Sequence, residues 1–448
     1  MVFVVVAVAV LALLVAVHRY LWVRFVRDTT ERGGAARRAG TVAAYVLPLL
    51  SVGALVSGRA GFPFPLQQAL AWPGFLWLAA LLYLTLALLV GEVVRPLLSR
   101  FLDRRAGRPG AHPAPAPAVP SPVPVPPADE PSAPSADEPS APSADGPSAA
   151  PADGPPVRSA ASPTPGPPAP TVSATSRRVF VARSVGGAAA LAGLGTVGYG
   201  TYGVLRGPRV KRVTVPLAKL PRAAHGFRIA VVSDIHLGPI LGRAHTRRVV
   251  DTINSTGPDL IAVVGDLVDG SVDDLGPAAE PLAGLRARHG QFFVTGNHEY
   301  FSGAAQWIDR VRELGLHPLE NARVELPGFD LAGVNDIGGE SEGHGPDFGR
   351  ALGDRDRSRT AVLLAHQPVL IHDAVAHGVD LQLSGHTHGG QLWPGNLIAE
   401  LANPTVAGLE RYGDTQLYVS RGAGAWGPPV RVGAPSDITV VELASRRA

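Results

Sequence analysis

The chain has 448 residues, a length that predicts two or three domains, and it contains no cysteine. The missing cysteines exclude disulfide bonds, thiolate metal sites, iron–sulfur clusters and cysteine nucleophiles. A formal net charge of +3 gives no sign of a nucleic-acid partner, and none is expected. Hydrophobic residues make up 46% of a chain that also holds 52 glycines and 43 prolines, so the composition must average segments of different kinds.

The first 105 residues predict a transmembrane region with three helices. Its apolar segments cover residues 1–22, 41–56 and 72–94, and a helix needs about 20 apolar residues to cross a bilayer. The third segment opens with Trp72, Phe75 and Trp77, aromatic residues typical of a membrane interface. A signal peptide or a buried helical hairpin is the alternative, but three such segments favour membrane spans.

Arginines predict the orientation of these segments. Six lie between positions 19 and 38, whereas the connection between the second and third segments carries only Arg59. The positive-inside rule therefore places the first connection in the cytoplasm and the N-terminus outside. The third segment then returns to the cytoplasm, where five arginines follow it at positions 95, 100, 104, 105 and 108.

Residues 106–176 consist mainly of Pro, Ala, Ser, Asp and Gly, and the unit ADEPSAPS occurs at positions 128 and 136. Such a segment has too few apolar side chains to offset its conformational entropy by burial. It is expected to be a disordered linker, and binding of a partner to its proline-rich stretches is the less favoured alternative.

Residues 177–207 combine a twin-arginine pair, Arg177 and Arg178, with an uncharged stretch at 184–205. The pair is typical of an export signal, and the stretch predicts a fourth transmembrane helix. A fourth span would make this a multi-pass protein of the cell membrane and place the rest of the chain outside the cell. The basic residues that follow oppose this orientation: Arg206, Arg209, Lys211 and Arg212.

Residues 213–443 are numerous enough for one domain with a substantial core. Short apolar runs occupy positions 227–232, 260–264, 292–294, 361–364, 379–383 and 417–419. Helical patterns lie between several of them, for example Trp307, Val311 and Leu314. Buried strands that alternate with helices predict a layered α/β domain, and later strands separated by turns add antiparallel pairing.

Each of these runs except the last leads directly into polar residues that can bind metals. Because ligands bind at the carboxyl ends of strands in α/β sheets, we expect the five clusters to meet at one site. Each cluster alone is a weak signal, since a turn, a cap or a surface histidine explains it equally well. In chain order the clusters contain Asp234 and His236; Asp266 and Asp269; Asn297, His298 and Glu299; His366; and His386 and His388.

This ordered set resembles the calcineurin-like metallophosphoesterases, whose pattern is D-x-H, G-D-x-x-D, G-N-H-D/E, H and G-H-x-H. The resemblance covers about residues 213–443. Two stretches, 220–229 and 420–429, are similar to a membrane-associated bacterial branch whose members often carry a twin-arginine signal or membrane anchor. The implied fold is α/β, a four-layer β-sandwich flanked by helices, here preceded by the helical transmembrane region.

The resemblance implies two divalent metal ions. Asp234, His236 and His388 would hold the first, and Asn297, His366 and His386 the second. Asp266 would bridge them, and His298 would act beside the substrate as a proton donor or phosphate contact. Asp269 and Glu299 would not be ligands. Nitrogen and oxygen ligands without sulfur suit Mn, Fe or Zn.

The sequence thus predicts a membrane-anchored, metal-dependent phosphoric ester hydrolase. A hydroxide bridging the two metals would attack a phosphomonoester or phosphodiester, such as an envelope lipid or nucleotide-sugar substrate. One alternative is that residues 213–443 form a non-catalytic sensor domain that binds metal or phosphate. Another is that the transmembrane region is a transporter or sensor and that this domain regulates it. Trp393, Tyr412 and Trp426 could line the substrate pocket, or belong to the core.

Overall fold

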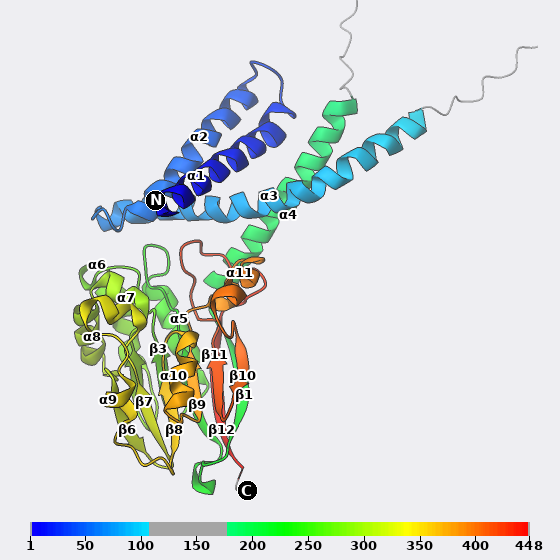
Figure 1. Ribbon diagram of the computed structural model, residues 1–448. Coiled ribbons are helices and arrows are strands. Elements are labelled where there is room, and N and C mark those ends of the chain that lie inside the picture. Colours follow the sequence, from blue (N-terminus) through cyan, green and yellow to red (C-terminus); the bar gives the residue numbers. More distant parts are fainter. Residues whose placement is uncertain (1, 107–176, 447–448) are drawn as a thin grey trace, which may run out of the picture. The chain divides into compact units, whose positions relative to one another are not determined.

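The computed structural model describes residues 2–106 and 177–446, so the predicted linker lies outside the described residues apart from its first position. The N-terminal part is helical (Figure 1). Helix α1 (Val2–Leu21) continues into a π-helical turn, η1 (Trp22–Arg27), and is followed by α2 (Ala35–Val56) and α3 (Phe64–Ala106). Helix α4 (Arg177–Leu205) precedes the sheets.

Four of the described helices are long and apolar enough to cross a membrane, with windows at 8–27, 35–56, 64–102 and 178–205. They indicate a membrane protein, while the number of spans and their orientation stay predictions. Helix α3 extends beyond the apolar segment at 72–94 because the polar residues at its ends are also good helix formers. Helix α4 begins at Arg177, so the twin arginines form its first turn.

The described chain after α4 contains two six-stranded sheets. The first has the order β1-β12-β2-β3-β4-β5, and the second has the order β10-β11-β9-β8-β7-β6. Bounds in the first sheet are β1 (Arg209–Leu217), β2 (Phe227–Val232), β3 (Leu260–Val264), β4 (Gln291–Val294), β5 (His317–Pro318) and β12 (Asp437–Ser445). Bounds in the second are β6 (Ala322–Leu326), β7 (Phe329–Gly333), β8 (Thr360–Leu364), β9 (Leu381–Ser384), β10 (Gly408–Tyr412) and β11 (Thr415–Val419).

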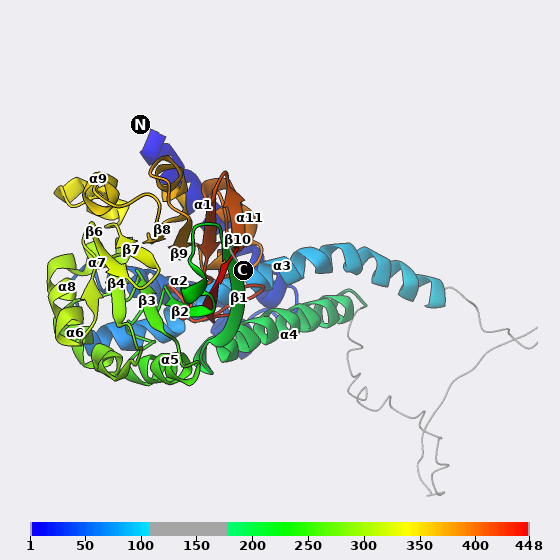
Figure 2. The same ribbon diagram turned by 90° about the horizontal axis from the view of Figure 1, so that it is seen from below.

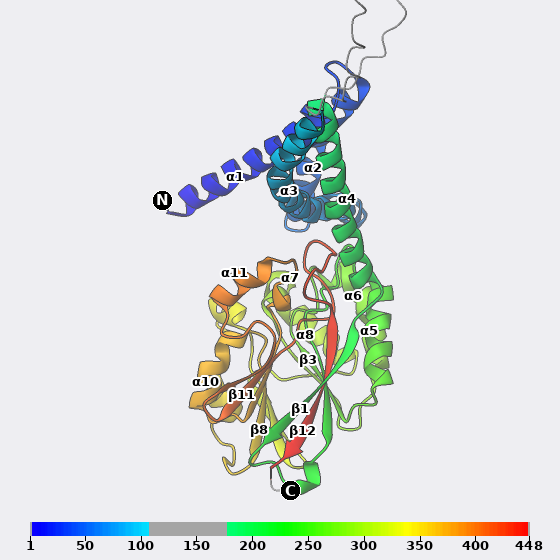
Figure 3. The same cartoon turned by 90° about the vertical axis from the view of Figure 1, so that its right-hand side faces the viewer.

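The predicted α/β sandwich of four layers is confirmed. Buried side chains from both sheets, such as Val231, Leu331 and Tyr418, form one apolar core between them. The opposite face of the first sheet packs against α5 (Arg243–Ser255), α6 (Val272–Ala279) and α8 (Ala304–Glu313). The opposite face of the second sheet packs against α9 (Phe348–Leu352) and α10 (Ile371–Ala376). Figures 2 and 3 show these helices on the two outer sides of the sheets.

Strand direction brings the polar loops to one edge. β2, β3 and β4 are parallel to one another, as are β7, β8, β9 and β11. β6 is antiparallel to β7, β10 is antiparallel to β11, and β12 is antiparallel to β2 but parallel to β1. Hydrogen bonds join the loops of the two sheets beyond the strand ends, from the Ala423 amide to the Ser233 carbonyl and from the His386 amide to the Asp234 carboxylate. The short helices at this edge are α7 (Asn297–Ser302), η6 (His388–Gly390) and α11 (Gly395–Ala402).

The remaining described elements are short 3-10 turns in the connections. They are η2 (Arg222–Ala224), η3 (Glu280–Gly284), η4 (Ile337–Glu342) and η5 (Pro368–Leu370).

Candidate metal centre

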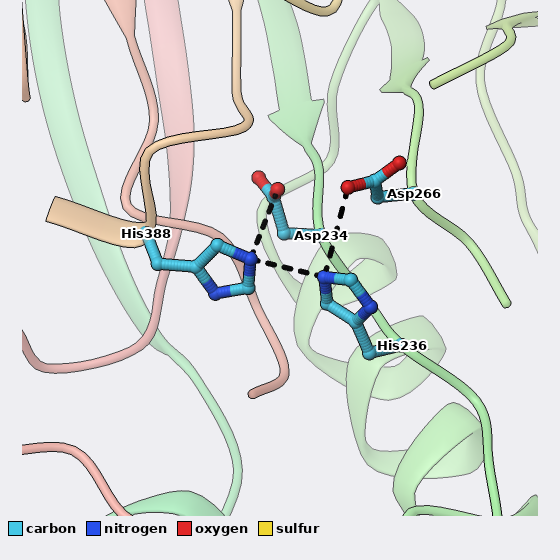
Figure 4. A group of neighbouring side chains, drawn as sticks. All are labelled: Asp234, His236, Asp266 and His388. Carbon is cyan, nitrogen blue, oxygen red and sulfur yellow. Dashed lines mark hydrogen bonds and ion pairs between the residues drawn. The ribbon is translucent and has the colours of Figure 1, made fainter. Parts of the chain in front are cut away.

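The loops after β2, β3 and β9 bring four side chains to a common point (Figure 4). These are Asp234, His236, Asp266 and His388, all buried, with ligand atoms within 4.8 Å of one another. The Nε2 atoms of His236 and His388 lie 3.0 Å apart. The Nε2 atom of His388 lies 3.4 Å from an Asp234 oxygen, and that of His236 lies 3.8 Å from an Asp266 oxygen. Converging nitrogen and oxygen atoms of this kind form the donor set of a divalent cation.

A second group adjoins the first and shares Asp266 with it. Asp266, His366 and His386 offer ligand atoms within the same 4.8 Å limit, and the Nε2 atom of His366 lies 3.1 Å from an Asp266 oxygen. Asn297 lies at the start of α7, and its buried Oδ1 atom has no hydrogen-bond partner among the described residues. A buried acceptor without a partner costs stability, so it points to a ligand that the protein chain does not supply. Six of the seven predicted ligands are therefore brought together in two groups, and Asn297 directly precedes His298, whose amide donates to Oδ1 of Asp266. Their role as ligands stays a prediction.

The backbone at this edge is unusual. Seven described residues other than glycine have a positive φ, and five of them are predicted ligands: Asp234 (52°), His236 (48°), Asp266 (52°), His386 (72°) and His388 (52°). Left-handed backbone at residues with a Cβ atom costs about 1 kcal/mol or more, and such strain clusters at functional sites. The fold thus holds the backbone of these five residues in a conformation that only two other described residues with a Cβ atom adopt, Asn321 and Gln391.

Two glycines permit the close approach of the loops. Gly265 has a φ of 73°, and a Cβ atom there would collide with the imidazole of His366. A Cβ atom at Gly296 would collide with the Asp266 carboxylate. Space therefore requires the glycines that precede Asp266 and Asn297 in the motifs, and at Gly265 the positive φ requires glycine as well.

Glu299 connects the loops that carry the predicted ligands. Its buried carboxylate accepts hydrogen bonds from the amides of Gly296 (2.6 Å), Leu267 (2.8 Å) and Asp266 (3.0 Å). Burial and the neighbouring charge of Asp266 raise the pKa of Glu299 to about 7. The residue fixes the loops after β3 and β4 relative to each other, and that it is not a ligand stays a prediction.

Asp269 joins a predicted ligand to the predicted proton donor. Its Oδ1 atom lies 2.9 Å from Nδ1 of His236 and 2.7 Å from Nδ1 of His298. Burial alone would raise the pKa of Asp269, but His236 and His298 lower it to about 2. An ionised acceptor at this position keeps a proton on Nδ1 of each ring and leaves Nε2 of each free to face the site.

The carboxylates and imidazoles of the site differ in pKa. Burial raises the pKa of Asp234, whereas His366 and its hydrogen bond lower that of Asp266 against the effect of burial. The pKa of His236 rises to about 9 despite burial, because Asp269 and Asp266 lie close to it. Burial and the neighbouring His366 lower the pKa of His386 to about 4, which keeps this ring neutral and able to bind a cation.

A cleft opens beside the site. Its walls in the sandwich domain include His236, Asp269, His298, Phe301 and Trp426. The rings of Phe301 and Trp426 meet the His298 ring edge-on, with centroids 5.6 and 5.8 Å away.

Two of the three aromatic residues suggested for the substrate pocket are not part of this lining. Trp393 lies in the loop before α11, and Tyr412 lies in β10 with its hydroxyl bonded to Thr405 and to the Pro404 carbonyl. Only Trp426 of the three lines the cleft.

Sequence reasoning missed Arg431. Its buried guanidinium donates to the carbonyl oxygens of Gly424, His388 and Ala434, and one Nη atom lies 3.2 Å from Nδ1 of His388. Burial lowers the pKa of Arg431 to about 10. No local motif marks this arginine, because Gly424 and Ala434 belong to its own loop between β11 and β12, whereas His388 belongs to the distant loop after β9.

The residues present fit two divalent cations. The donors are carboxylate oxygens, neutral imidazole nitrogens and one amide oxygen, with Asp266 common to both groups. The absence of sulfur argues against metals that prefer thiolates, and the donor types alone do not choose among Mn, Fe and Zn.

Comparison with known proteins gives the family. The profile of the calcineurin-like phosphoesterases matches residues 227–390. The chain is 37% identical over 259 residues to a transmembrane protein with a metallophosphoesterase domain from Danio rerio. The aligned region covers 55% of this chain and 59% of that protein. It is 38% identical to an uncharacterized metallophosphoesterase of Helicobacter pylori, over 56% of this chain and 68% of that protein.

A Bacillus subtilis metallophosphoesterase, also uncharacterized, is 31% identical over 60% of this chain and 98% of its own length. The chain thus spans under two thirds of the Danio rerio relative but nearly all of the Bacillus subtilis one. The profile match and these relatives establish that this chain belongs to the calcineurin-like metallophosphoesterase family.

Proposed function

We propose that this protein is a membrane-anchored phosphoesterase that hydrolyses a phosphomonoester or phosphodiester with two divalent metal ions. The observation that carries the proposal is the pair of ligand groups that share Asp266. Asp234, His236 and His388 would complete the first cation site, and Asn297, His366 and His386 the second. When bound, two such ions supply positive charge that orients a phosphoryl group and activates a water molecule.

The chain's own residues prepare the reaction around these ions. Asp269 accepts from Nδ1 of His298 and so fixes the ring orientation and the tautomer. In its imidazolium form, His298 would then transfer the Nε2 proton to the leaving alkoxide oxygen and become neutral, with its remaining proton on Nδ1 held by Asp269. The rings of Phe301 and Trp426 cover His298 on two sides and would shield this proton from exchange with water.

Substrate class follows from the anchoring. Four candidate spans and the transmembrane relative support a site held near a bilayer, which favours an envelope lipid or a lipid-linked or nucleotide-sugar phosphoester. Orientation follows from the arginines: with four spans and a cytoplasmic first connection, the catalytic domain would lie outside the cell. A reporter fused after Ala448 that is active only outside the cytoplasm tests this orientation.

The activity is tested with the full-length protein, purified in detergent and loaded with Mn²⁺. We expect hydrolysis of an aryl phosphomonoester or an aryl phosphodiester, and loss of this activity after chelation. Two bound metal ions without hydrolysis of either substrate would instead favour a metal- or phosphate-binding sensor head. Full activity of an Asp266→Ala variant would refute the two-metal mechanism.

A further inference from the structure

Helix α11 (Gly395–Ala402) presents its apolar side chains to solvent. Leu397, Ile398 and Leu401 are 56%, 72% and 88% exposed, and none of the eight residues of the helix is buried. Positions i, i+1 and i+4 lie on one face of a helix, so the three side chains form a single apolar surface. A helix on the surface of a soluble domain normally turns such a face towards the core.

Two exposed tryptophans extend this apolar surface beyond α11. Trp393 and Trp426 are 53% and 55% exposed. Gln391 connects their loops, because its side chain donates to the Trp426 carbonyl and accepts from the Trp426 amide. We name Trp393, Leu397, Ile398, Leu401 and Trp426 together the apolar rim. Exposed apolar groups gathered in this way mark interaction surfaces, and tryptophan is typical of a membrane interface.

The apolar rim is connected to residues of the candidate metal centre. Helix α11 follows η6 (His388–Gly390), which begins at a predicted ligand. The Leu392 amide donates to the Gly390 carbonyl, so the turn between the two helices is closed. At the other end of the rim, the Trp426 ring contacts the His298 ring at 5.8 Å between centroids. Whatever covers the rim therefore lies at the entrance to the candidate metal centre.

Strand register places this edge next to a candidate membrane span. Helix α4 ends at Leu205 and β1 begins at Arg209, a separation of at most about 14 Å between these Cα atoms. Arg209 pairs with Asp437, and Thr439 of the same strand pairs with Val231 near the carboxyl end of β2. The chain thus leaves α4 and enters the sheet at the edge that carries the predicted ligands. At the end of α4, Val204 packs against Leu241 and Ala425 of the loops at that edge.

Basic side chains follow the span at the same edge. Arg206, Arg209 and Arg212 are exposed. Basic residues directly beside a membrane span attract anionic lipid headgroups. The apolar rim and the three arginines therefore match the two layers of a lipid surface, its acyl boundary and its headgroups.

We propose that the apolar rim docks on the lipid surface, with Leu397, Ile398 and Leu401 entering the boundary between headgroups and acyl chains. Docking holds the entrance of the metal centre against the bilayer, so a substrate reaches it from the lipid. The contact concerns the exposed side chains alone and does not depend on phosphoesterase activity. Its test can therefore fail or succeed separately from the test of the proposed function.

The absence of cysteine allows a direct measurement on the full-length chain. Ile398→Cys and Leu401→Cys are prepared singly, labelled with an environment-sensitive NBD fluorophore and reconstituted into nanodiscs of anionic phospholipid. The matched control is Asp414→Cys, an exposed position before β11. Because β11 runs parallel to β9, this control lies at the opposite edge of the sheet from the metal centre.

Nanodiscs that contain nitroxide-labelled lipids should quench the labels at positions 398 and 401 at least twofold more than the label at 414. Equal quenching at all three positions would overturn the proposal. A blue-shifted emission at 398 and 401 without quenching by the nitroxide lipids would also overturn it, because it would show that protein rather than lipid covers the rim. Thermal unfolding of each labelled variant checks that the fold is retained.

Discussion

The two sheets contribute different chemistry to the same edge. The loops after β2 and β3 in the first sheet provide the carboxylates Asp234, Asp266 and Asp269, together with His236. The loops after β8 and β9 in the second sheet provide only imidazoles: His366, His386 and His388. One half of the sandwich therefore supplies negative charge that would hold cations, and the other half supplies only nitrogen donors.

The pKa values show what this division does. His236 and His386 are similar side chains, yet the pKa of His236 is raised to about 9 and that of His386 is lowered to about 4. Burial lowers both, and carboxylates next to His236 reverse its effect there. His366 belongs to the second sheet, but it reaches the Asp266 carboxylate and its pKa is also raised. His236 and His366, each within 3.1 Å of a carboxylate oxygen, thus have raised pKa values, whereas burial, His236 and Arg431 lower the pKa of His388, which lies 3.4 Å from Asp234.

The largest effect is expected from Asp266→Asn, since Asp266 is the one carboxylate common to both ligand groups. Loss of this charge should lower kcat/KM by about 10³-fold or more, because each bound cation contributes several kcal/mol to the transition state. Metal content measured by mass spectrometry should fall together with the activity. Asp251→Asn, on the exposed side of α5, is the matched control. Unchanged metal content in Asp266→Asn would contradict a shared ligand.

His298→Ala tests the predicted proton donor, which follows β4 in the first sheet. Removal of a general acid should lower turnover by about 10²- to 10⁴-fold while both metal ions remain bound. The loss should be greatest with an alkyl phosphoester, whose leaving oxygen needs a proton, and small with a nitrophenyl ester, whose leaving group does not. Equal losses with both esters would argue that His298 only contacts the phosphate.

Asp269→Asn tests the carboxylate behind the ligands. Asp269 lies 2.9 Å from Nδ1 of His236, whereas the predicted ligand His388 of the second sheet has Arg431 at 3.2 Å from its Nδ1. A carboxylate increases the basicity of a ligand, but a guanidinium has no acceptor and cannot. We expect Asp269→Asn to weaken metal affinity or activity by about 10- to 100-fold. Metal titration at constant pH gives the affinity, and a wild-type value would exclude this role of Asp269.

Much of the sandwich could be predicted because its strands are continuous apolar runs bounded by turn residues. Strands β2 and β3 begin and end where the runs at 227–232 and 260–264 do. The clustering of the predicted ligands followed from their positions at strand ends. Features that depend on contacts distant in sequence could not be predicted. These include the left-handed backbone at Asp234 and Asp266, the position of Arg431 beside His388, and the apolar face that α11 leaves exposed.

The surroundings of histidines outside the motifs could not be predicted from the sequence either. His245 is one of these histidines, and it gives the prediction with the smallest expected effect. It lies in α5, is 1% exposed, and neither ring nitrogen has a hydrogen-bond partner among the described residues. Burial, with the charges of Arg248 and Arg431, lowers its pKa to about 3. It therefore shows what burial does to an imidazole that no carboxylate approaches.

The lowered pKa of His245 determines how the stability of the fold depends on pH. Above pH 6.5 the ring is neutral in both the folded and the unfolded chain, and His245 contributes no pH dependence. Between pH 6.5 and 3 only the unfolded chain binds the proton, so stability falls as the pH falls, by about 2 kcal/mol at pH 5. In His245→Leu the difference in melting temperature between pH 7 and pH 5 should shrink by the corresponding amount. A variant with the full wild-type difference would show that His245 charges inside the fold, and that burial alone does not keep an imidazole neutral here.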